Sequence, residues 1–173
     1  PNIFIHEKTG TMGFADYILA HKQSLVPYSN LSPEVACLTE PIGVAVDMTY
    51  VADIQLGNDV MVLGLGAIGL AAIPIAKMQG AGKIYAVNRS GGKRAELAKA
   101  LGAEVILDTP LDEINFRKGG LDRALVTADP KVLPEVMPLM NYGGFISFIG
   151  INWPDGDITF NATPRSITAC CAL

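Results

Sequence analysis

A glycine-rich turn directly after a short apolar segment is the feature that most constrains how this chain can fold. Residues 59–63 read Asp-Val-Met-Val-Leu, and Gly-Leu-Gly-Ala-Ile-Gly follows at residues 64–69, before a stretch of helix-forming residues. The spacing G-x-G-x-x-G between a strand and a helix is typical of a βαβ unit that binds a dinucleotide. A second apolar segment, at residues 83–87, begins where the next strand of such a unit is expected.

Each glycine of the turn has a physical role in a unit of this kind. Gly64 allows the tight turn out of the strand, Gly66 lets the backbone approach a pyrophosphate, and Gly69 lets the helix pack close to the sheet. The N–H groups and the dipole at the helix N-terminus favour a bound anion. We therefore predict that the turn holds the diphosphate of a ligand; a turn without a ligand is the alternative. The predicted residues are Gly64, Gly66, Ala67, Ile68 and Gly69.

Composition and charge narrow the class of protein further. Hydrophobic residues make up 50% of the 173 residues and charged residues 17%, which supplies an ample core and argues against disorder. A net charge of −4 argues against binding to nucleic acid or to an anionic membrane surface. Lys77 and Gln79 interrupt the longest apolar run, so no membrane span is predicted. With no signal peptide visible and no C-x-x-C pair among the three cysteines, we expect a cytoplasmic protein without a structural zinc or a disulfide frame.

Strand and helix patterns alternate from residue 57 onward. This alternation predicts an α/β fold, a doubly wound parallel sheet (Rossmann) with helices on both faces. Strands are predicted at residues 59–63, 83–87, 103–107, 124–127 and 145–150, the last after a Gly143-Gly144 turn, with edge strands at 158–160 and 167–173. Helices are predicted at 67–78, 93–101 and 131–140, and a weak crossover at 109–120.

The first part of the chain, residues 1–31, does not fit a doubly wound sheet. An apolar segment at residues 14–20 predicts a strand. Ser32 is a favourable N-cap, and Pro33 suits the first position of a helix. Pro41 interrupts this helical pattern, and a second helix is predicted from Pro41 towards residue 53.

The end of the second predicted strand bears on which dinucleotide would bind. An acidic residue there usually accepts hydrogen bonds from the adenine ribose and would repel a 2′-phosphate. This strand ends in Asn88-Arg89-Ser90 instead, and Arg89 can form two hydrogen bonds with a phosphate. We predict that Asn88, Arg89, Ser90 and Arg94 surround the adenosine end and favour NADP(H) over NAD(H). A solvated basic loop is the alternative.

Several ordered motifs resemble the medium-chain, zinc-type alcohol dehydrogenase superfamily, and Glu40-Pro41 is most similar to its sorbitol and polyol dehydrogenase branch. The resemblance covers most of the chain, from about residue 10 to residue 150. The motifs are residues 13–17 (Gly-Phe-Ala-Asp-Tyr), 31–36 (Leu-Ser-Pro-Glu-Val-Ala), 40–41 (Glu-Pro), 64–69, 94–98 with 101–103 (Leu-Gly-Ala), and 143–146 (Gly-Gly-Phe-Ile).

The resemblance implies a longer, two-domain enzyme that binds NAD(P) in a Rossmann domain and oxidises or reduces small alcohols, polyols or carbonyl compounds with a catalytic zinc. We therefore expect residues 1–46 to be a remnant of a β-rich catalytic domain with a linking helix, and residues 47–173 to be the NAD(P)-binding Rossmann domain. The family pairs Rossmann sheets edge to edge, which implies a homo-oligomer. By the same resemblance, residues along the ribose and nicotinamide are Thr127, Ala128, Ile149 and Gly150.

Glu40 has two interpretations. It stands between apolar residues, where a buried carboxylate is costly unless it is paired, hydrogen-bonded or bound to metal. From residue chemistry it is a cap for the helix that starts at Pro41. By resemblance it ligates or approaches the catalytic zinc in a full-length parent. A single ligand does not hold zinc tightly, because catalytic sites use about three protein ligands, so we expect neither bound zinc nor catalytic residues in this chain by itself.

Two other functions stay open at this point. One is a zinc-free reductase of quinones or enoyl thioesters from the same superfamily, against which Glu40-Pro41 argues. The other is a dinucleotide-binding module without catalytic activity, because a fold does not determine a function.

Overall fold

The computed structural model describes residues 15–18, 20–149 and 168–171. Within these residues, no helix is both long enough and apolar enough to cross a membrane. Contacts within the chain separate two compact units, with the division between Cys37 and Leu38. The predicted domain boundary, between residues 46 and 47, falls inside the first long helix, α3 (Thr39–Val51).

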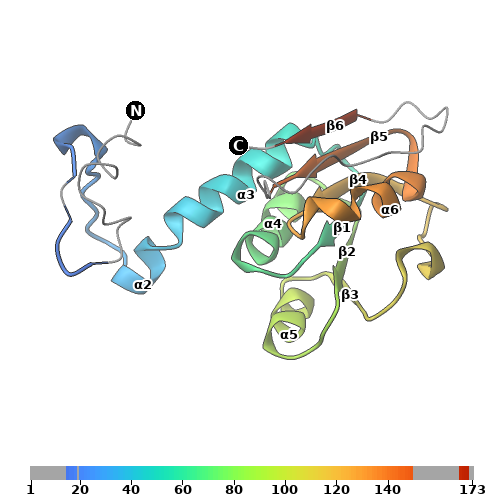
Figure 1. The fold of residues 1–173 in the computed structure, drawn as a ribbon, viewed down its shortest axis with the longest axis horizontal. Coiled ribbons are helices and arrows are strands. Elements are labelled where there is room, and N and C mark those ends of the chain that lie inside the picture. The colour runs from blue at the N-terminus through green and yellow to red at the C-terminus, as the bar shows by residue number, and fades with distance from the viewer. Residues whose placement is uncertain (1–14, 19, 150–167, 172–173) are drawn as a thin grey trace. The chain divides into compact units, whose positions relative to one another are not determined.

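A parallel sheet of six strands forms the second unit and confirms the predicted Rossmann fold (Figure 1). The strands lie in the order β3-β2-β1-β4-β5-β6, so the chain moves outward from β1 in both directions. The strand order reverses between β1 and β4, where the chain crosses from one half of the sheet to the other. Ligands of such sheets bind outside the carboxyl ends of the strands at that point. The strands are β1 (Asp59–Leu63), β2 (Lys83–Asn88), β3 (Glu104–Leu107), β4 (Leu121–Val126), β5 (Met140–Phe148) and β6 (Thr168–Cys171).

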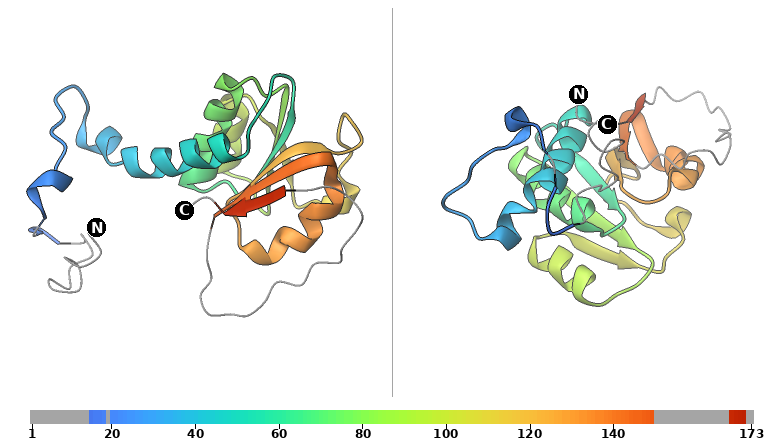
Figure 2. Two further views of the ribbon diagram at one scale, coloured as in Figure 1. Left: turned by 90° about the horizontal axis from the view of Figure 1, so that it is seen from above. Right: turned by 60° about the vertical axis from the view of Figure 1, so that its left-hand side comes forward.

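Helices cover both faces of this sheet (Figures 1 and 2). In β1, Val60 and Val62 face one apolar cluster while Met61 and Leu63 face the other, as the alternation of a strand requires. The first cluster includes residues of α3, α4 (Ala67–Met78) and α5 (Lys93–Ala100). The second includes residues of α6 (Leu133–Val136) and of the connection between β3 and β4. Because both faces are covered, all five residues of β1 are buried.

The two helices behind β1 pack closely because small side chains line their contact. Ala45 of α3 and Ala52, the residue that follows α3, share a fully buried cluster with Ala72, Ile73 and Ala76 of α4. Complete burial of a side chain such as that of Ile73 stabilises the fold by about 1.5–3 kcal/mol. This packing fixes α4 and therefore fixes the position of its N-terminus at the end of β1.

Two predictions near β5 are wrong in extent. The predicted helix at residues 131–140 is α-helical only at Leu133–Val136, with 3₁₀ turns on either side, because Pro134 and Pro138 lack the N–H that a longer helix needs. The predicted strand at 145–150 begins instead at Met140, and Gly143 lies inside β5 with a φ of 75°. The register there passes from Leu121↔Met140 to Arg123↔Phe145, so the extra residues of β5 form an irregularity.

Other predictions can be compared only in part. The described residues of the predicted strand at 14–20 are bends or irregular, since no described segment of the first unit pairs with them and a strand needs such a partner. No strand is described between residues 20 and 37 either, so the expected β-rich character is absent from the part of the first unit that the structure describes. Ser32 caps α2 (Pro33–Ala36), as predicted. The predicted edge strand at 167–173 is present as β6, whereas 158–160 lies outside the described residues.

The connection between β3 and β4 contains one 3₁₀ turn, Leu111–Glu113, in place of a helix. It is held to the sheet by Arg117, whose N–H donates to the Tyr85 hydroxyl oxygen at 2.8 Å. The Arg117 guanidinium forms an ion pair with the fully buried Asp59 through two hydrogen bonds, one from Nε at 3.1 Å. Phe116 packs edge-on against Tyr85, with ring centroids 5.1 Å apart. These contacts hold residues 116 and 117 of the connection against β1 and β2.

Candidate functional site

The glycine-rich turn has the geometry that its sequence predicts. Gly64 has a φ of 97°, and its N–H donates to the Val87 carbonyl of β2 at 3.0 Å. A Cβ at Gly64 would lie 2.8 Å from Thr127 Oγ1, so the position excludes a side chain as well as favouring glycine conformationally. Gly64 therefore closes the turn between β1 and α4.

Gly69 is buried where α4 begins its path along the sheet. A Cβ there would collide with the Gly64 carbonyl oxygen and lie 2.9 Å from Thr127 Oγ1. Thr127 follows β4 and supports the turn from the neighbouring strand, because its hydroxyl donates to the Gly64 carbonyl at 2.8 Å and its N–H to the Leu63 carbonyl at 2.9 Å. The role predicted for Gly69 in close packing is thus present, while Thr127 acts as a support for the turn.

Gly66 differs from the other two glycines. It is the N-cap residue of α4, with φ −75° and ψ −173°, and no side chain caps this helix end. Apart from the two residues next to it in the chain, no described residue has an atom within 4 Å of a Cβ built on Gly66. The structure therefore does not require glycine at this position for packing, and the first N–H groups of α4 have no intrahelical acceptor. An open helix N-terminus of this kind suits an anionic group.

Beyond β2, the Asn88 side chain binds the chain itself. Its Oδ1 accepts from the Leu65 N–H at 3.4 Å, and its Nδ2 donates to the Ser90 carbonyl at 2.7 Å. Asn88 therefore connects the glycine-rich turn to the loop that follows β2. Arg89, Ser90 and Arg94 are exposed next to it. These three side chains are exposed and can contact a ligand, whereas the Asn88 amide is already hydrogen-bonded to the chain.

A cleft of about 890 Å³ lies at the carboxyl ends of β1 to β4, where the sheet order places a ligand. Its volume is within the range of about 300–1,000 Å³ that is typical of small-molecule sites. The predicted site residues that line it are Gly64, Asn88, Arg89, Ser90, Arg94 and Ala128. The predicted residues Gly66, Ala67, Ile68, Gly69, Thr127 and Ile149 are not among its lining residues, and Gly150 lies outside the described residues.

Other residues of the cleft were missed by the sequence analysis. They follow β3 or surround α6, and they are Asp108, Thr109, Pro110, Leu111, Asp129, Lys131, Val132 and Glu135. The residues after β3 could have been predicted from the sequence, because β3 lies beside β2 in a sheet of this class and the carboxyl ends of both strands lie at the same edge. The residues around α6 depend on the broken helix around Leu133, which the sequence pattern misjudged.

Glu40 lies in the first turn of α3, and its side chain is exposed rather than buried in its apolar surroundings. The N-cap residue of α3 is Leu38, with no side-chain hydrogen bond, so the interpretation of Glu40 as the cap is wrong. The helix begins at Thr39 because proline is tolerated within the first turn, where its missing N–H has no intrahelical acceptor. Among the described residues, no group of three or more His, Cys, Asp or Glu side chains could hold a metal ion. A zinc ion therefore does not fit the described residues, and the role of Glu40 as a ligand stays a prediction.

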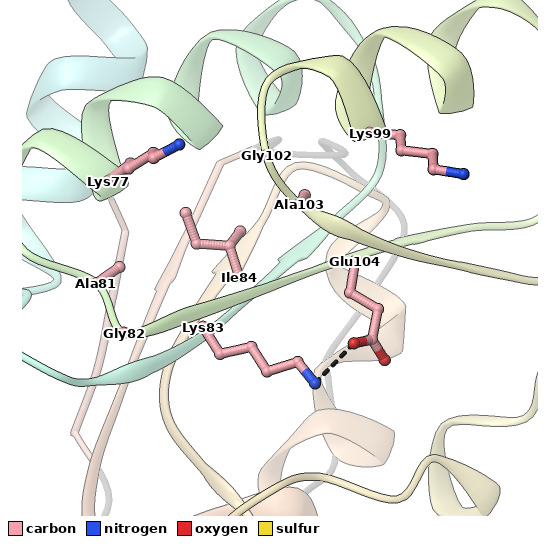
Figure 3. Close-up of a pocket in the computed structure, with 9 residues that line it drawn as sticks. All are labelled: Lys77, Ala81, Gly82, Lys83, Ile84, Lys99, Gly102, Ala103 and Glu104. Atoms are coloured by element: carbon pink, nitrogen blue, oxygen red, sulfur yellow. Dashed lines mark ion pairs between the residues drawn. The ribbon is translucent and has the colours of Figure 1, made fainter.

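A second hollow, of about 420 Å³, lies at the opposite ends of β2 and β3 (Figure 3). Three lysines line it, and Lys83 Nζ pairs with Glu104 at 2.6 Å. The hydrogen bond from Lys83 to Glu104 raises the pKa of the Lys83 ammonium group. Lys77 and Lys99 stand in the last turns of α4 and α5, where a positive charge offsets the negative end of the helix dipole. The charges of this hollow are thus explained by the ends of the helices and by one ion pair.

Comparison with known proteins agrees with the geometry of the sheet and the turn. A family described as zinc-binding dehydrogenase matches residues 67–169, which is more than half of the chain. The chain belongs to the zinc-binding dehydrogenase family. Its membership confirms the resemblance drawn from the sequence motifs, for the cofactor-binding part of such proteins.

Individual members of the family show how much of a relative this chain represents. The chain is 32% identical to an L-threonine 3-dehydrogenase of Caldanaerobacter subterraneus subsp. tengcongensis, over 96% of this chain and 52% of that enzyme. It is 27% identical to L-galactonate-5-dehydrogenase of Escherichia coli, over 80% of this chain and 42% of that enzyme. The crystal structure of 2R,3R-butanediol dehydrogenase from Bacillus subtilis superposes with a TM-score of 0.72 at 29% identity, over 84% of this chain and 44% of that one. The chain therefore spans about half the length of the curated relatives that it matches.

Proposed function

We propose that this chain is the cofactor-binding part of an NAD(P)-dependent oxidoreductase that acts on small alcohols, polyols or carbonyl compounds. The observation that carries the proposal is the open N-terminus of α4 at Gly66, beside the point where the strand order reverses between β1 and β4. The adjoining cleft at the carboxyl ends of the strands has the size for a nucleotide. Membership of the zinc-binding dehydrogenase family supports the reaction class.

The N-terminus of α4 would hold the diphosphate of the dinucleotide. The backbone N–H groups of Ala67, Ile68 and Gly69 are the donors at this helix end, and their dipoles favour an anion. The open space beside Gly66 permits a phosphate to approach the backbone closely. The Thr127 hydroxyl and the Val87 carbonyl both hydrogen-bond Gly64, so the turn would keep its conformation when a diphosphate binds.

Next to the diphosphate, Arg89, Ser90 and Arg94 would surround the adenosine end. The amide of Asn88 stands where related sites carry a carboxylate, so this strand end does not repel a 2′-phosphate. We therefore expect NADP(H) to bind more tightly than NAD(H). By the resemblance, Thr127, Ala128, Ile149 and Gly150 would follow the ribose and nicotinamide, largely through their backbones.

Bound in this way, the nicotinamide would supply the hydride acceptor or donor of the reaction. The described residues of this chain would hold and orient the cofactor. Zinc, with Glu40 as one ligand, would assist only in the whole protein. We expect the isolated chain to be inactive, to retain no stoichiometric zinc on metal analysis, and to belong to a protein of the cytoplasm.

Titration of the chain with NADPH, followed by the fluorescence of the reduced nicotinamide, tests this proposal. Saturable binding that Arg89→Ala weakens, and that Lys99→Ala in the second hollow leaves unchanged, is the expected result. Lys99 is an exposed cation near the opposite edge of the sheet, so it controls for a nonspecific effect of charge. Absence of saturable binding to NADPH and to NADH would contradict the proposal.

A further inference from the structure

The turn after β3 places a carboxylate at the outer end of the cleft. Asp108 follows β3, and its N–H donates to the Asn88 carbonyl of β2 at 3.2 Å. The next residue, Thr109, donates its hydroxyl to the Leu107 carbonyl at 2.9 Å, and Pro110 follows it. The register Asn88↔Leu107 joins the two strands at this edge. These contacts hold the backbone of Asp108 beside the residues predicted to bind adenosine.

The Asp108 carboxylate lines the cleft and is exposed. Its backbone has a φ of 48°, a left-handed conformation that aspartate tolerates better than most residues. Among the described residues, no hydrogen bond or ion pair engages this carboxylate. The cleft therefore contains an acceptor, on a backbone held in place, whose partner is not another described side chain.

The sheet order indicates which part of a dinucleotide would meet this carboxylate; this step rests on the proposed function. The glycine-rich turn ends β1, Asn88 ends β2, and β3 lies one further strand away from the diphosphate. Neighbouring strands are about 4.8 Å apart, so each step outward advances by roughly one group of the ligand. If the diphosphate lies at β1 and the ribose at β2, the base lies at β3.

An ionised carboxylate accepts hydrogen bonds and donates none. At the base, the 6-amino group of adenine is a donor that matches it, whereas the 6-oxo group of hypoxanthine is an acceptor that would face it unfavourably. We propose that Asp108 recognises the adenine base by accepting a hydrogen bond from its 6-amino group. Asp108 would then determine specificity for the base, separately from the recognition of the 2′-position by Arg89.

Binding of NADPH and of nicotinamide hypoxanthine dinucleotide phosphate, the analogue in which a 6-oxo group replaces the amino group, tests this inference by calorimetry. The wild-type chain should prefer NADPH by roughly tenfold to a hundredfold, the range for a hydrogen bond to a charged group. Asp108→Asn should bring the ratio close to one, because an amide can present either a donor or an acceptor. Asparagine also tolerates the left-handed backbone, so the variant should fold.

Asp112→Asn is the matched control, because Asp112 is an exposed acid of the same connection that does not line the cleft. It should keep the wild-type ratio. An unchanged ratio in Asp108→Asn would overturn the role of Asp108 while leaving cofactor binding intact. Equal losses for NADPH and its analogue would assign Asp108 to the ribose and overturn the inference as well. If the wild-type chain binds neither ligand, the proposed function fails and this inference fails with it.

Discussion

Substitution of Gly66 by alanine separates ligand binding from folding at the glycine-rich turn. Gly66 has an extended backbone that alanine adopts without strain, and a methyl group there would meet no atom of a described residue within 4 Å other than those of its chain neighbours. Alanine is a somewhat poorer N-cap than glycine, but it also reduces the conformational entropy of the unfolded chain by about 0.4–1 kcal/mol. These effects oppose each other, so we expect the free energy of unfolding to change by less than about 1 kcal/mol.

The same methyl group would occupy the space through which a phosphate reaches the N-terminus of α4. Loss of one charge-assisted hydrogen bond costs about 1.5–3 kcal/mol, so the affinity for NADPH should fall by roughly one to two decades. Gly69→Ala provides the contrast, because its methyl group would collide with the Gly64 carbonyl oxygen. That variant should lose stability by about 1–3 kcal/mol, the usual range for overpacking.

Urea unfolding and calorimetric titration of both variants measure the two quantities separately. Gly43→Ala is a suitable reference, because a Cβ at Gly43, a residue of α3, would meet no described atom within 4 Å outside its chain neighbours and the backbone of its own helix. The expected pattern is intact folding with weakened binding for Gly66→Ala, and a destabilised fold for Gly69→Ala. Binding of NADPH to Gly66→Ala with wild-type affinity would refute the reasoning that assigns the open space to a diphosphate.

Three further predictions concern the loop, the sheet and the assembly. Arg89→Ala should weaken NADPH binding by roughly one to two decades while barely changing NADH binding. Equal affinities of the wild-type chain for both cofactors in calorimetry would show that the loop is a solvated turn. Burial raises the pKa of Asp122, but hydrogen bonds from Lys118, from the Asp59 N–H and from Asn141 outweigh it and hold the pKa below the ordinary value of 3.8. The stabilisation by these hydrogen bonds is present above pH 3.8 and is lost as the pH falls through the folded-state pKa. In urea unfolding, the free energy of unfolding of Asp122→Asn should therefore decline less in acid than that of the wild-type chain, and an equal decline would count against this role of Asp122. The parallel edge strand β6 (Thr168–Cys171) should promote self-association, which light scattering would disprove by showing a monomer at high concentration.

The first strand and the helix of the βαβ unit at the start of the Rossmann domain were predictable to the residue, whereas β2 runs one residue beyond its predicted end. Strand β1 and helix α4 have the bounds that the sequence predicts, because local signals agree there with the packing. An apolar strand, glycines with backbone and packing constraints, and a run of helix formers all specify the same structure. The roles of Gly64 and Gly69 followed from the motif for the same reason.

Predictions failed where local signals conflict or where a partner decides the outcome. The prolines at 134 and 138 limit the helix to Leu133–Val136, although the apolar pattern extends further. The Gly143-Gly144 pair was interpreted as a turn before β5, yet pairing with β4 extends the strand back to Met140. The strand predicted around residues 14–20 is absent from its described part, where no neighbouring strand pairs with it.

Within the site, adjacency in the sheet determined what the sequence did not show. Asn88 lines the cleft, as the predicted site requires, and its amide also bridges Leu65 and Ser90, which the sequence did not show. An aspartate at that position would lose the donor to the Ser90 carbonyl, so Asn88→Asp would disturb the loop conformation as well as adding a negative charge. Asp108 follows β3 and meets the cleft because β3 pairs with β2.

The most direct test of the account is a backbone-amide NMR titration of the chain with NADPH. The account predicts that binding perturbs the amides of residues 64–69, 88–90 and 108–111, which lie in the turn or along the cleft, and leaves those around Lys83 and Glu104 unchanged. Perturbations confined to the lysine-lined hollow, or none at saturating NADPH, would contradict the assignment of this edge of the sheet as the cofactor site.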